Sequence, residues 1–247
     1  MQNPFAVLIF MVIGIVLLVK GFLMHRRKRL IQDLPTSKIR ALAMGLVEIK
    51  GKATQNKLNL FKSPINHKEC VYYKFTIEEY KKQGKSSKWV LKQKDERREP
   101  FQVQDETGSV LVNPEGAAID IPIDYEYESS FGRDPPKIVM EYLAQRNISF
   151  ENILGLNKTM RYREYYIAPN DKLFILGTAG KNTLVASALK NTDNIIIQTG
   201  PKNMPFYISD KKEEEITKSL NWKSIALIMG GTTLFSLGGY FIITMII

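Results

Sequence analysis

The sequence predicts a membrane protein of the α+β class, in which two transmembrane helices flank a β-rich antiparallel soluble domain with one amphipathic helix. Two apolar runs occupy the ends of the chain, 5–24 and 224–247; the first contains one charged residue, Lys20, and the second contains none. Each run supplies the roughly 20 residues that a helix needs to cross a bilayer. Between them, short segments alternate apolar and polar residues, which is typical of half-buried strands. We therefore divide the chain into a first transmembrane helix (5–24), a soluble domain (35–209), a juxtamembrane helix (210–223) and a second transmembrane helix (224–247).

Basic residues beside the two apolar runs predict how the chain is inserted. Four of them follow the first run: Arg26, Arg27, Lys28 and Arg29. Lys218 and Lys223 precede the second run, whereas 1–4 and 224–247 carry no charged side chain. Lys and Arg beside a span tend to stay on the cytoplasmic side. We therefore expect an integral protein of the cell membrane with a cytoplasmic domain and both termini on the opposite side.

A cleaved signal peptide is the alternative explanation of the first run. Signal peptides begin with a positively charged segment and end at a small-residue cleavage site. Residues 1–4 carry no positive side chain, and no small-residue site follows Met24. We expect the run to remain in the protein as a membrane helix.

The period-two segments predict a chain of short strands interrupted by one helix. The expected helix covers 136–146, where Ile138, Val139, Tyr142 and Leu143 form one apolar face. Pro122 should confine its strand to an edge or a bulge. The expected strands are 43–53, 70–80, 88–94, 101–103, 110–112, 119–127, 160–167, 172–177, 194–199 and 205–209.

The sequence contains few candidate residues for catalysis or for metal binding. The sequence has one cysteine, Cys70, and two histidines, His25 and His67, too few for a zinc module or an internal disulfide. His67 and Cys70 resemble a catalytic dyad, but alternation makes Cys70 a packed strand residue. The segment 177–183 lacks the glycine and hydroxyl spacing of a phosphate-binding loop and is expected to be a turn. We expect no catalytic, cofactor-binding or metal-binding residues.

One acidic segment allows two interpretations. It contains Asp120, Asp124, Glu126 and Glu128. Clustered carboxylates suit a divalent cation, but alternate residues on one strand face are about 7 Å apart. A solvated acidic face is the interpretation that we prefer.

Several segments, taken together, resemble the GIDE domain, also called the beside-a-membrane domain. The segment 161–177, RYREYYIAPNDKLFILG, is similar to the family pattern RYxExxIxPGDxLYVLG. Its matching positions include Arg161, Tyr162, Glu164, Pro169, Asp171 and Gly177. Upstream, Cys70-Val71-Tyr72-Tyr73 with Trp89, and the hairpin around Asp105, are similar to further parts of the pattern. The resemblance covers most of 35–247.

The resemblance implies a membrane domain related to that of Mulan-type mitochondrial ubiquitin ligases. In those proteins the domain lies between two spans, faces the intermembrane space and is followed by a RING zinc domain. A RING needs eight Cys and His ligands, and this sequence has three such residues. The chain therefore resembles prokaryotic, RING-less members, and we expect a scaffold or binding module rather than an enzyme. The alternative is the scaffold of a ligase-like system whose RING lies on another chain.

A lysine-rich hairpin is the candidate binding surface. It contains Lys81, Lys82, Lys85 and Lys88 together with Trp89. The net charge of +10 also suits nucleic acid, but basic residues beside membrane spans fit a bilayer surface better. We expect anionic lipid headgroups or an acidic protein as partner, and no nucleic acid; the alternative is an ordinary hairpin with Trp89 in the core.

Small residues in the second span predict close helix packing. They are Gly231, Gly238, Thr232 and Ser236. Small residues at such spacings let helix backbones approach closely. Gly14 and Gly21 in the first span are also seven residues apart, so we expect the two spans of one chain to pair.

Overall fold

A computed structural model of the protein describes residues 4–32, 34–54, 60–84, 86–152, 155–182, 194–201, 204–210 and 213–246. The chain forms two compact units. A helical unit combines the two ends of the chain, 1–35 and 211–247, and a β-rich unit comprises Thr36–Asp210.

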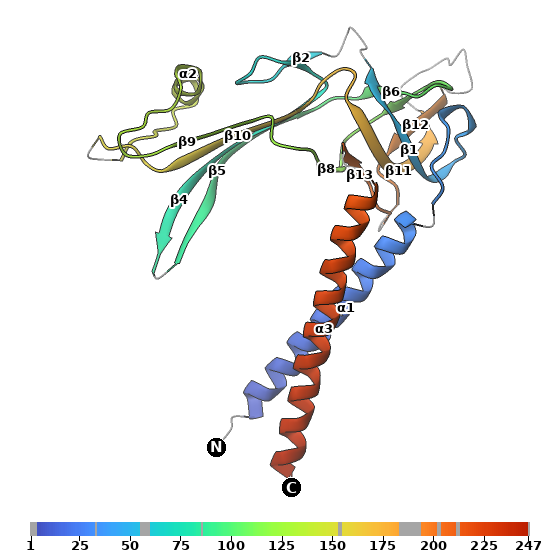
Figure 1. Ribbon diagram of the computed structural model, residues 1–247, viewed down its shortest axis with the longest axis vertical. Coiled ribbons are helices and arrows are strands. Elements are labelled where there is room, and N and C mark those ends of the chain that lie inside the picture. The colour runs from blue at the N-terminus through green and yellow to red at the C-terminus, as the bar shows by residue number, and fades with distance from the viewer. Residues whose placement is uncertain are drawn as a thin grey trace. The chain divides into compact units, whose positions relative to one another are not determined.

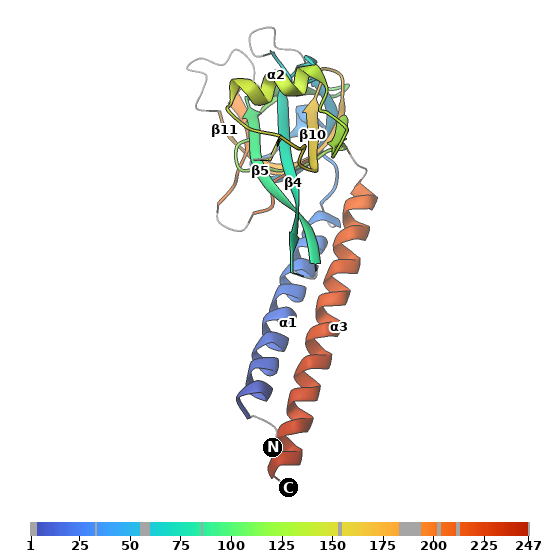
Figure 2. The same cartoon turned by 90° about the vertical axis from the view of Figure 1, so that its left-hand side faces the viewer.

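The helical unit consists of α1 (Pro4–Gln32) and α3 (Glu213–Ile246), which run side by side (Figures 1 and 2). Within them, Val7–Arg26 and Asn221–Ile242 are long and apolar enough to cross a membrane. The second helix continues from its polar first turns into the apolar part without a break. The two helices therefore indicate that the chain is anchored in a membrane at both ends of the β-rich unit.

The two long helices pack through positions that repeat every seven residues. The buried positions are Val7, Gly14 and Gly21 on α1 and Ser224, Gly231 and Gly238 on α3. A Cβ atom on Gly231 would lie 2.8 Å from the carbonyl oxygen of Gly14. One on Gly238 would lie 2.4 Å from Cγ of Met11. A larger side chain at either glycine would therefore force the helices apart.

Thr232 and Ser236, which we expected at this interface, lie outside it. Both are exposed, and the Thr232 hydroxyl donates hydrogen bonds to the carbonyl oxygens of Ile228 and Met229 in its own helix. The α3 positions that contact α1 are spaced seven residues apart and include Gly231. Thr232 is the next residue along the helix, so its side chain points away from that contact face. Hydrogen bonding within the helix satisfies this hydroxyl without a partner helix.

A five-stranded barrel forms one half of the β-rich unit. Its strands, in order, are β1 (Gly45–Thr54), β6 (Phe101–Gln104), β7 (Ser109–Val112), β12 (Ile195–Gln198) and β11 (Lys172–Lys181). The barrel closes because β1 pairs with both β6 and β11. Fully buried apolar side chains from all five strands fill it: Ile49, Val103, Val112, Ile175 and Ile197. Two short strands, β13 (Tyr207–Ser209) and β8 (Ala118–Asp120), extend the sheet beside β11.

A four-stranded sheet forms the other half. Its order is β5 (Ser86–Arg98), β4 (Tyr72–Gln83), β10 (Met160–Ile167) and β9 (Tyr125–Ser129). The helix α2 (Lys137–Gln145) covers one face, where Val139, Tyr142 and Leu143 pack on Phe75 and Tyr162 (Figure 2). A two-stranded sheet of β2 (Phe61–Lys62) and β3 (Glu69–Cys70) and a short helix, η1 (Ile39–Ala41), complete the fold.

Three expectations about the strands were wrong. The soluble domain is not wholly antiparallel, because β7–β12 and β8–β13 are parallel pairs. The segment 119–127 is not one strand: β8 ends at Asp120, β9 begins at Tyr125, and the two belong to different sheets. Pro122 lies in the gap, where it has no N–H to offer to a ladder. The segment 177–181 is part of β11 rather than a turn, because its residues pair with β1 and β12.

Candidate functional site

The lysine-rich hairpin is a protruding two-stranded ribbon made by the ends of β4 and β5. Its pairs run from Tyr80↔Trp89 through Lys81↔Lys88 and Lys82↔Ser87 to Gln83↔Ser86. The ladder between β4 and β10 ends at Glu79↔Met160, and the Tyr80 N–H donates one further hydrogen bond to the Thr159 carbonyl oxygen at 2.9 Å. Beyond Tyr80, among the described residues, no third strand pairs with the ribbon. Figure 1 shows β4 and β5 running well beyond β9 and β10. We call this segment, 80–89, the ribbon.

The ribbon carries positive charge on both faces and no acidic residue. Alternation places Lys81 and Lys88 on one face and Lys82 on the other, beside Tyr80. Glu79, just before the ribbon, lies 3.6 Å from the Lys81 amine. Across the part of the chain that the structure describes, neither Lys82 nor Lys88 has a carboxylate within 4.0 Å. Lys85 lies outside the described residues.

Trp89 lies at the base of the ribbon rather than in the hydrophobic core. The Arg161 guanidinium lies 4.2 Å from the centroid of its ring, and the Tyr80 ring lies 5.1 Å away. Trp89 is half-buried by these neighbours, whereas Tyr80 is 43% exposed. The tryptophan therefore joins the ribbon to the sheet, and Tyr80 is the aromatic side chain that reaches solvent.

An ion-pair cluster on the sheet holds this base in place. Arg161 donates to Glu78 through Nε at 3.0 Å, and Arg163 donates to both oxygens of the same carboxylate at 2.6 and 2.5 Å. Burial opposes ionisation of Glu78, but the bonds from the two guanidinium groups outweigh it and lower its pKa. The pairing of Glu78 with Arg161 and Arg163 could not be predicted from the sequence. Glu78 lies on β4 and the two arginines lie on β10, and only the fold defines the register between these strands.

Glu164, another residue of the family motif, is a fully buried anchor. Its carboxylate accepts hydrogen bonds from the backbone N–H groups of Ile65, at 2.7 Å, and Asn66, at 3.0 Å. These bonds fix the loop between β2 and β3 and bring Ile65 into the core beneath α2. The Tyr162 side chain, also fully buried, lies with its hydroxyl 3.3 Å from that of Ser129.

The remaining motif residues shape the turn between β10 and β11 and the packing of β11. Asp171 closes the turn by accepting a hydrogen bond from the Ala168 N–H at 2.7 Å, and Pro169 lies inside it. Asn170 stands where the family pattern has glycine and has φ 73°, a conformation that asparagine tolerates better than most residues. Gly177 permits close packing, since a Cβ atom there would lie 2.7 Å from Cγ2 of Ile197. The motif residues therefore act as structural anchors.

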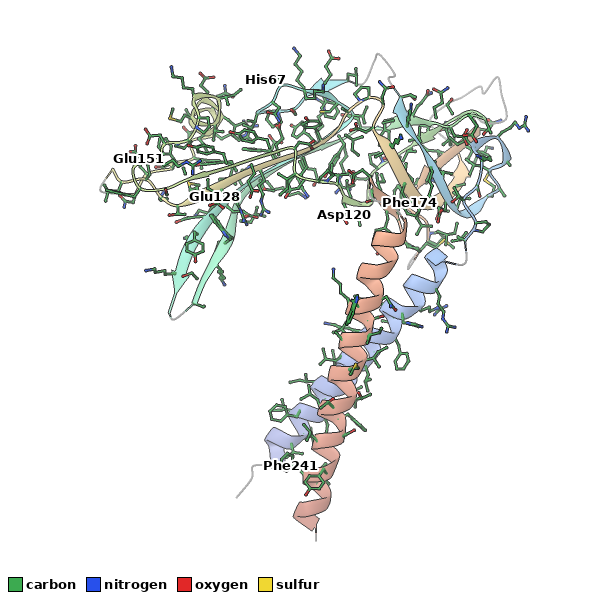
Figure 3. All side chains as sticks on the ribbon, in the orientation of Figure 1. His67, Asp120, Glu128, Glu151, Phe174 and Phe241 are labelled. Atoms are coloured by element: carbon green, nitrogen blue, oxygen red, sulfur yellow. The ribbon has the colours of Figure 1, made fainter. Side chains whose placement is uncertain are left out.

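The residues that resembled catalytic or metal-binding sets are separated or used for packing. Cys70 is fully buried, and burial raises the pKa of its thiol to about 12, whereas His67 is exposed. Asp120 belongs to the barrel sheet and Glu128 to the four-stranded sheet, and Figure 3 shows them apart. Among the described residues, no group of three or more His, Cys, Asp or Glu side chains is placed to hold a metal ion.

A cavity of about 420 Å³ was not predicted, because its lining comes from three separate segments. It lies between the β8–β9 connection, the β10–β11 turn and Asp210, and its polar lining includes Asp124 and Asp171. Asp124 accepts a hydrogen bond from the Tyr166 N–H at 2.9 Å. Burial, followed by the charges of neighbouring carboxylates, raises the pKa of Asp124.

The basic residues after the first apolar run lie on the last turns of α1. Arg26 and Arg29 are exposed. The side chains of Arg27 and Lys28 lie outside the described residues. Their positions at the end of Val7–Arg26 keep these charges at one end of the candidate span.

Comparison with known proteins identifies the family. A family model described as "GIDE: E3 Ubiquitin ligase" matches residues 72–243, which include the ribbon, the motif 161–177 and most of α3. No curated protein and no solved structure matches the chain. Since the matched segment covers well over half of the sequence, this chain belongs to the GIDE domain family of E3 ubiquitin ligases.

Proposed function

We propose that this chain is a membrane-anchored, non-catalytic binding and scaffold module that acts at a membrane surface. The observation that carries the proposal is the ribbon: a lysine-bearing projection on a compact β-rich unit whose two ends continue into apolar helices. A projection without acidic residues is a poor contributor to folding, because Lys81 and Lys88 face each other directly and repel. Binding of a negatively charged partner relieves that repulsion.

The roles of the family residues support a module without chemistry of its own. Arg161 contacts Glu78 and Trp89, and Glu164 accepts hydrogen bonds from backbone N–H groups. Both side chains therefore have partners inside the fold. Cys70 keeps its proton because it is buried. These residues stabilise the β-rich unit from which the ribbon projects.

The family description favours a second candidate, the scaffold of an E3 ubiquitin-ligase-like system whose RING lies on another chain. In that case the β-rich unit recruits a catalytic partner. The neighbourhood of the coding region distinguishes the two functions: a ligase scaffold is expected beside genes for RING or ubiquitin-like proteins, and a general scaffold is not.

Capture from native membranes tests the proposal directly. The full chain, solubilised with its partners, is compared with a variant in which Lys81, Lys82, Lys85 and Lys88 are changed to Glu. The proposal expects the variant to lose protein or lipid components that the wild type retains. A control variant with Glu at Lys52, Lys62, Lys68 and Lys137, which are exposed elsewhere in the domain, should retain them. Identical sets of bound components from the two variants would contradict the proposal.

A further inference from the structure

The ribbon's lysines are arranged for contact through its end rather than through one face. Lys81 and Lys88 project to one side, and Lys82 projects to the other. A rigid protein partner that matched one face would leave the charge on the other face unused. A surface that surrounds the end of the ribbon neutralises both faces together.

The chemistry of the cations also points to a diffuse anionic surface. The stretch from Tyr80 to Lys94 contains six lysines, no arginine and no acidic residue. Arginine provides planar, bidentate recognition of a fixed carboxylate or phosphate, whereas lysine acts as a mobile point charge. Where this sheet needs fixed geometry, at Glu78, it uses Arg161 and Arg163. The ribbon uses lysine alone, which suits mobile anions.

The exposed apolar groups near the ribbon fit the same kind of surface. Tyr80 is 43% exposed and Leu91, on the same strand as Trp89, is 54% exposed. Tyrosine is enriched at membrane–water interfaces, because its ring is apolar and its hydroxyl group remains hydrated. Lysine stems cover apolar groups while the amines stay in water.

We infer that the end of the ribbon binds the phosphate-bearing headgroups of anionic lipids at a bilayer surface. This inference rests on the proposed function and names the partner of the same ribbon. Each copy of the chain carries two helices that are apolar enough to span a membrane, so a bilayer accompanies the ribbon wherever the chain resides. Each lysine beside an anionic bilayer contributes roughly a fivefold factor to association.

Hydrogen exchange of the full chain in lipid nanodiscs tests the inference. Discs of phosphatidylcholine alone are compared with discs that also contain phosphatidylglycerol. Amides of 80–89 should exchange about fivefold or more slowly in the anionic discs, while those of β11 in the barrel should not change. The slowing should disappear as salt is raised toward 1 M, where the screening length falls to about 3 Å.

Two triple variants and one soluble anion complete the test. Lys81, Lys82 and Lys88 changed to Glu should abolish the difference between the two discs, whereas Glu at Lys62, Lys68 and Lys137 should preserve it. Slowing in neutral discs on addition of inorganic phosphate would identify a free-anion site and overturn the membrane assignment. Equal exchange in both discs would also overturn it; if the four-lysine variant nevertheless loses a protein in the capture experiment, the proposed function stands and the ribbon binds protein.

Discussion

At the scale of single residues, a buried carboxylate decides how the loop before β3 is held. Glu164 is fully buried, and its two oxygens accept from two successive backbone N–H groups, those of Ile65 and Asn66. A charged acceptor makes such bonds stronger than a neutral one does. The glutamate of the family motif is thus explained by loop anchoring.

We expect Glu164→Gln to reduce the free energy of unfolding by about 2 to 3 kcal/mol, because the amide nitrogen replaces one acceptor with a donor. Chemical denaturation followed by the near-ultraviolet circular dichroism of the full chain in detergent measures the change. The control is Glu128→Gln on the neighbouring strand β9, an exposed position where we expect a change within about 0.5 kcal/mol. Equal effects of the two substitutions would show that Glu164 does not anchor the loop.

At the scale of elements, the ribbon depends on the strand beside it. Arg161 on β10 lies over the Trp89 ring and bonds to Glu78, whereas Arg163 bonds to Glu78 and, among the described residues, stacks on no aromatic ring. A bare two-stranded ribbon is marginally stable in water. The guanidinium stacked on Trp89 is therefore one of the contacts that hold the base of the ribbon on the sheet, beside the backbone hydrogen bond that the Tyr80 N–H donates to the Thr159 carbonyl oxygen at 2.9 Å.

We expect Arg161→Gln to loosen the ribbon and Arg163→Gln to leave it in place. The sequence has two tryptophans, so a Trp222→Phe background makes fluorescence report on Trp89 alone. Loss of a cation–π contact worth about 0.5 to 2 kcal/mol should shift the emission to the red and increase acrylamide quenching. An unchanged spectrum in Arg161→Gln, or the same shift in Arg163→Gln, would argue that Trp89 is held by something else.

At the scale of the whole molecule, the first question is whether the two apolar helices form a single packed unit. Changing Gly231 and Gly238 to Leu should separate them, because each new side chain meets α1 at less than 3 Å from its first carbon. We expect a loss of roughly 1 to 3 kcal/mol per site, measured as a lower melting temperature in detergent. Leu at Gly230 and Gly239, where nothing lies within 4 Å, is the matched control. Unchanged melting of the Gly231 and Gly238 variant would contradict the pairing.

The second question is which side of the membrane holds the β-rich unit. We expect the cytoplasmic side, from the basic residues after the first span. Cys70 is buried with a thiol pKa raised to about 12, so the native chain should resist thiol reagents, and a cysteine at the exposed position Glu151 becomes the reporter (Figure 3). An impermeant maleimide should label Glu151→Cys in permeabilised cells and not in intact cells. Labelling of intact cells would show that the β-rich unit lies on the opposite side of the membrane.

The sequence by itself determined the features that depend on local pattern. The length and apolarity of its two terminal runs indicated helices long enough to span a membrane, and α1 and α3 have that character. Period-two alternation located β10 to the residue, and the apolar stripe at 138–143 located α2. The family resemblance, carried by the motif at 161–177, is confirmed by the match over 72–243.

Tertiary structure decided what depends on contacts between distant residues. Alternation reveals the faces of a strand but not its neighbours, so neither the barrel closure by β1 and β11 nor the two parallel pairs was visible in the pattern. Glu164 meets Ile65 across 99 residues of sequence, and Lys81 faces Lys88 because of one register among several that a lysine-rich hairpin allows. Strand register and burial come from packing the whole domain at once, and that packing turned a run of lysines into a projecting ribbon.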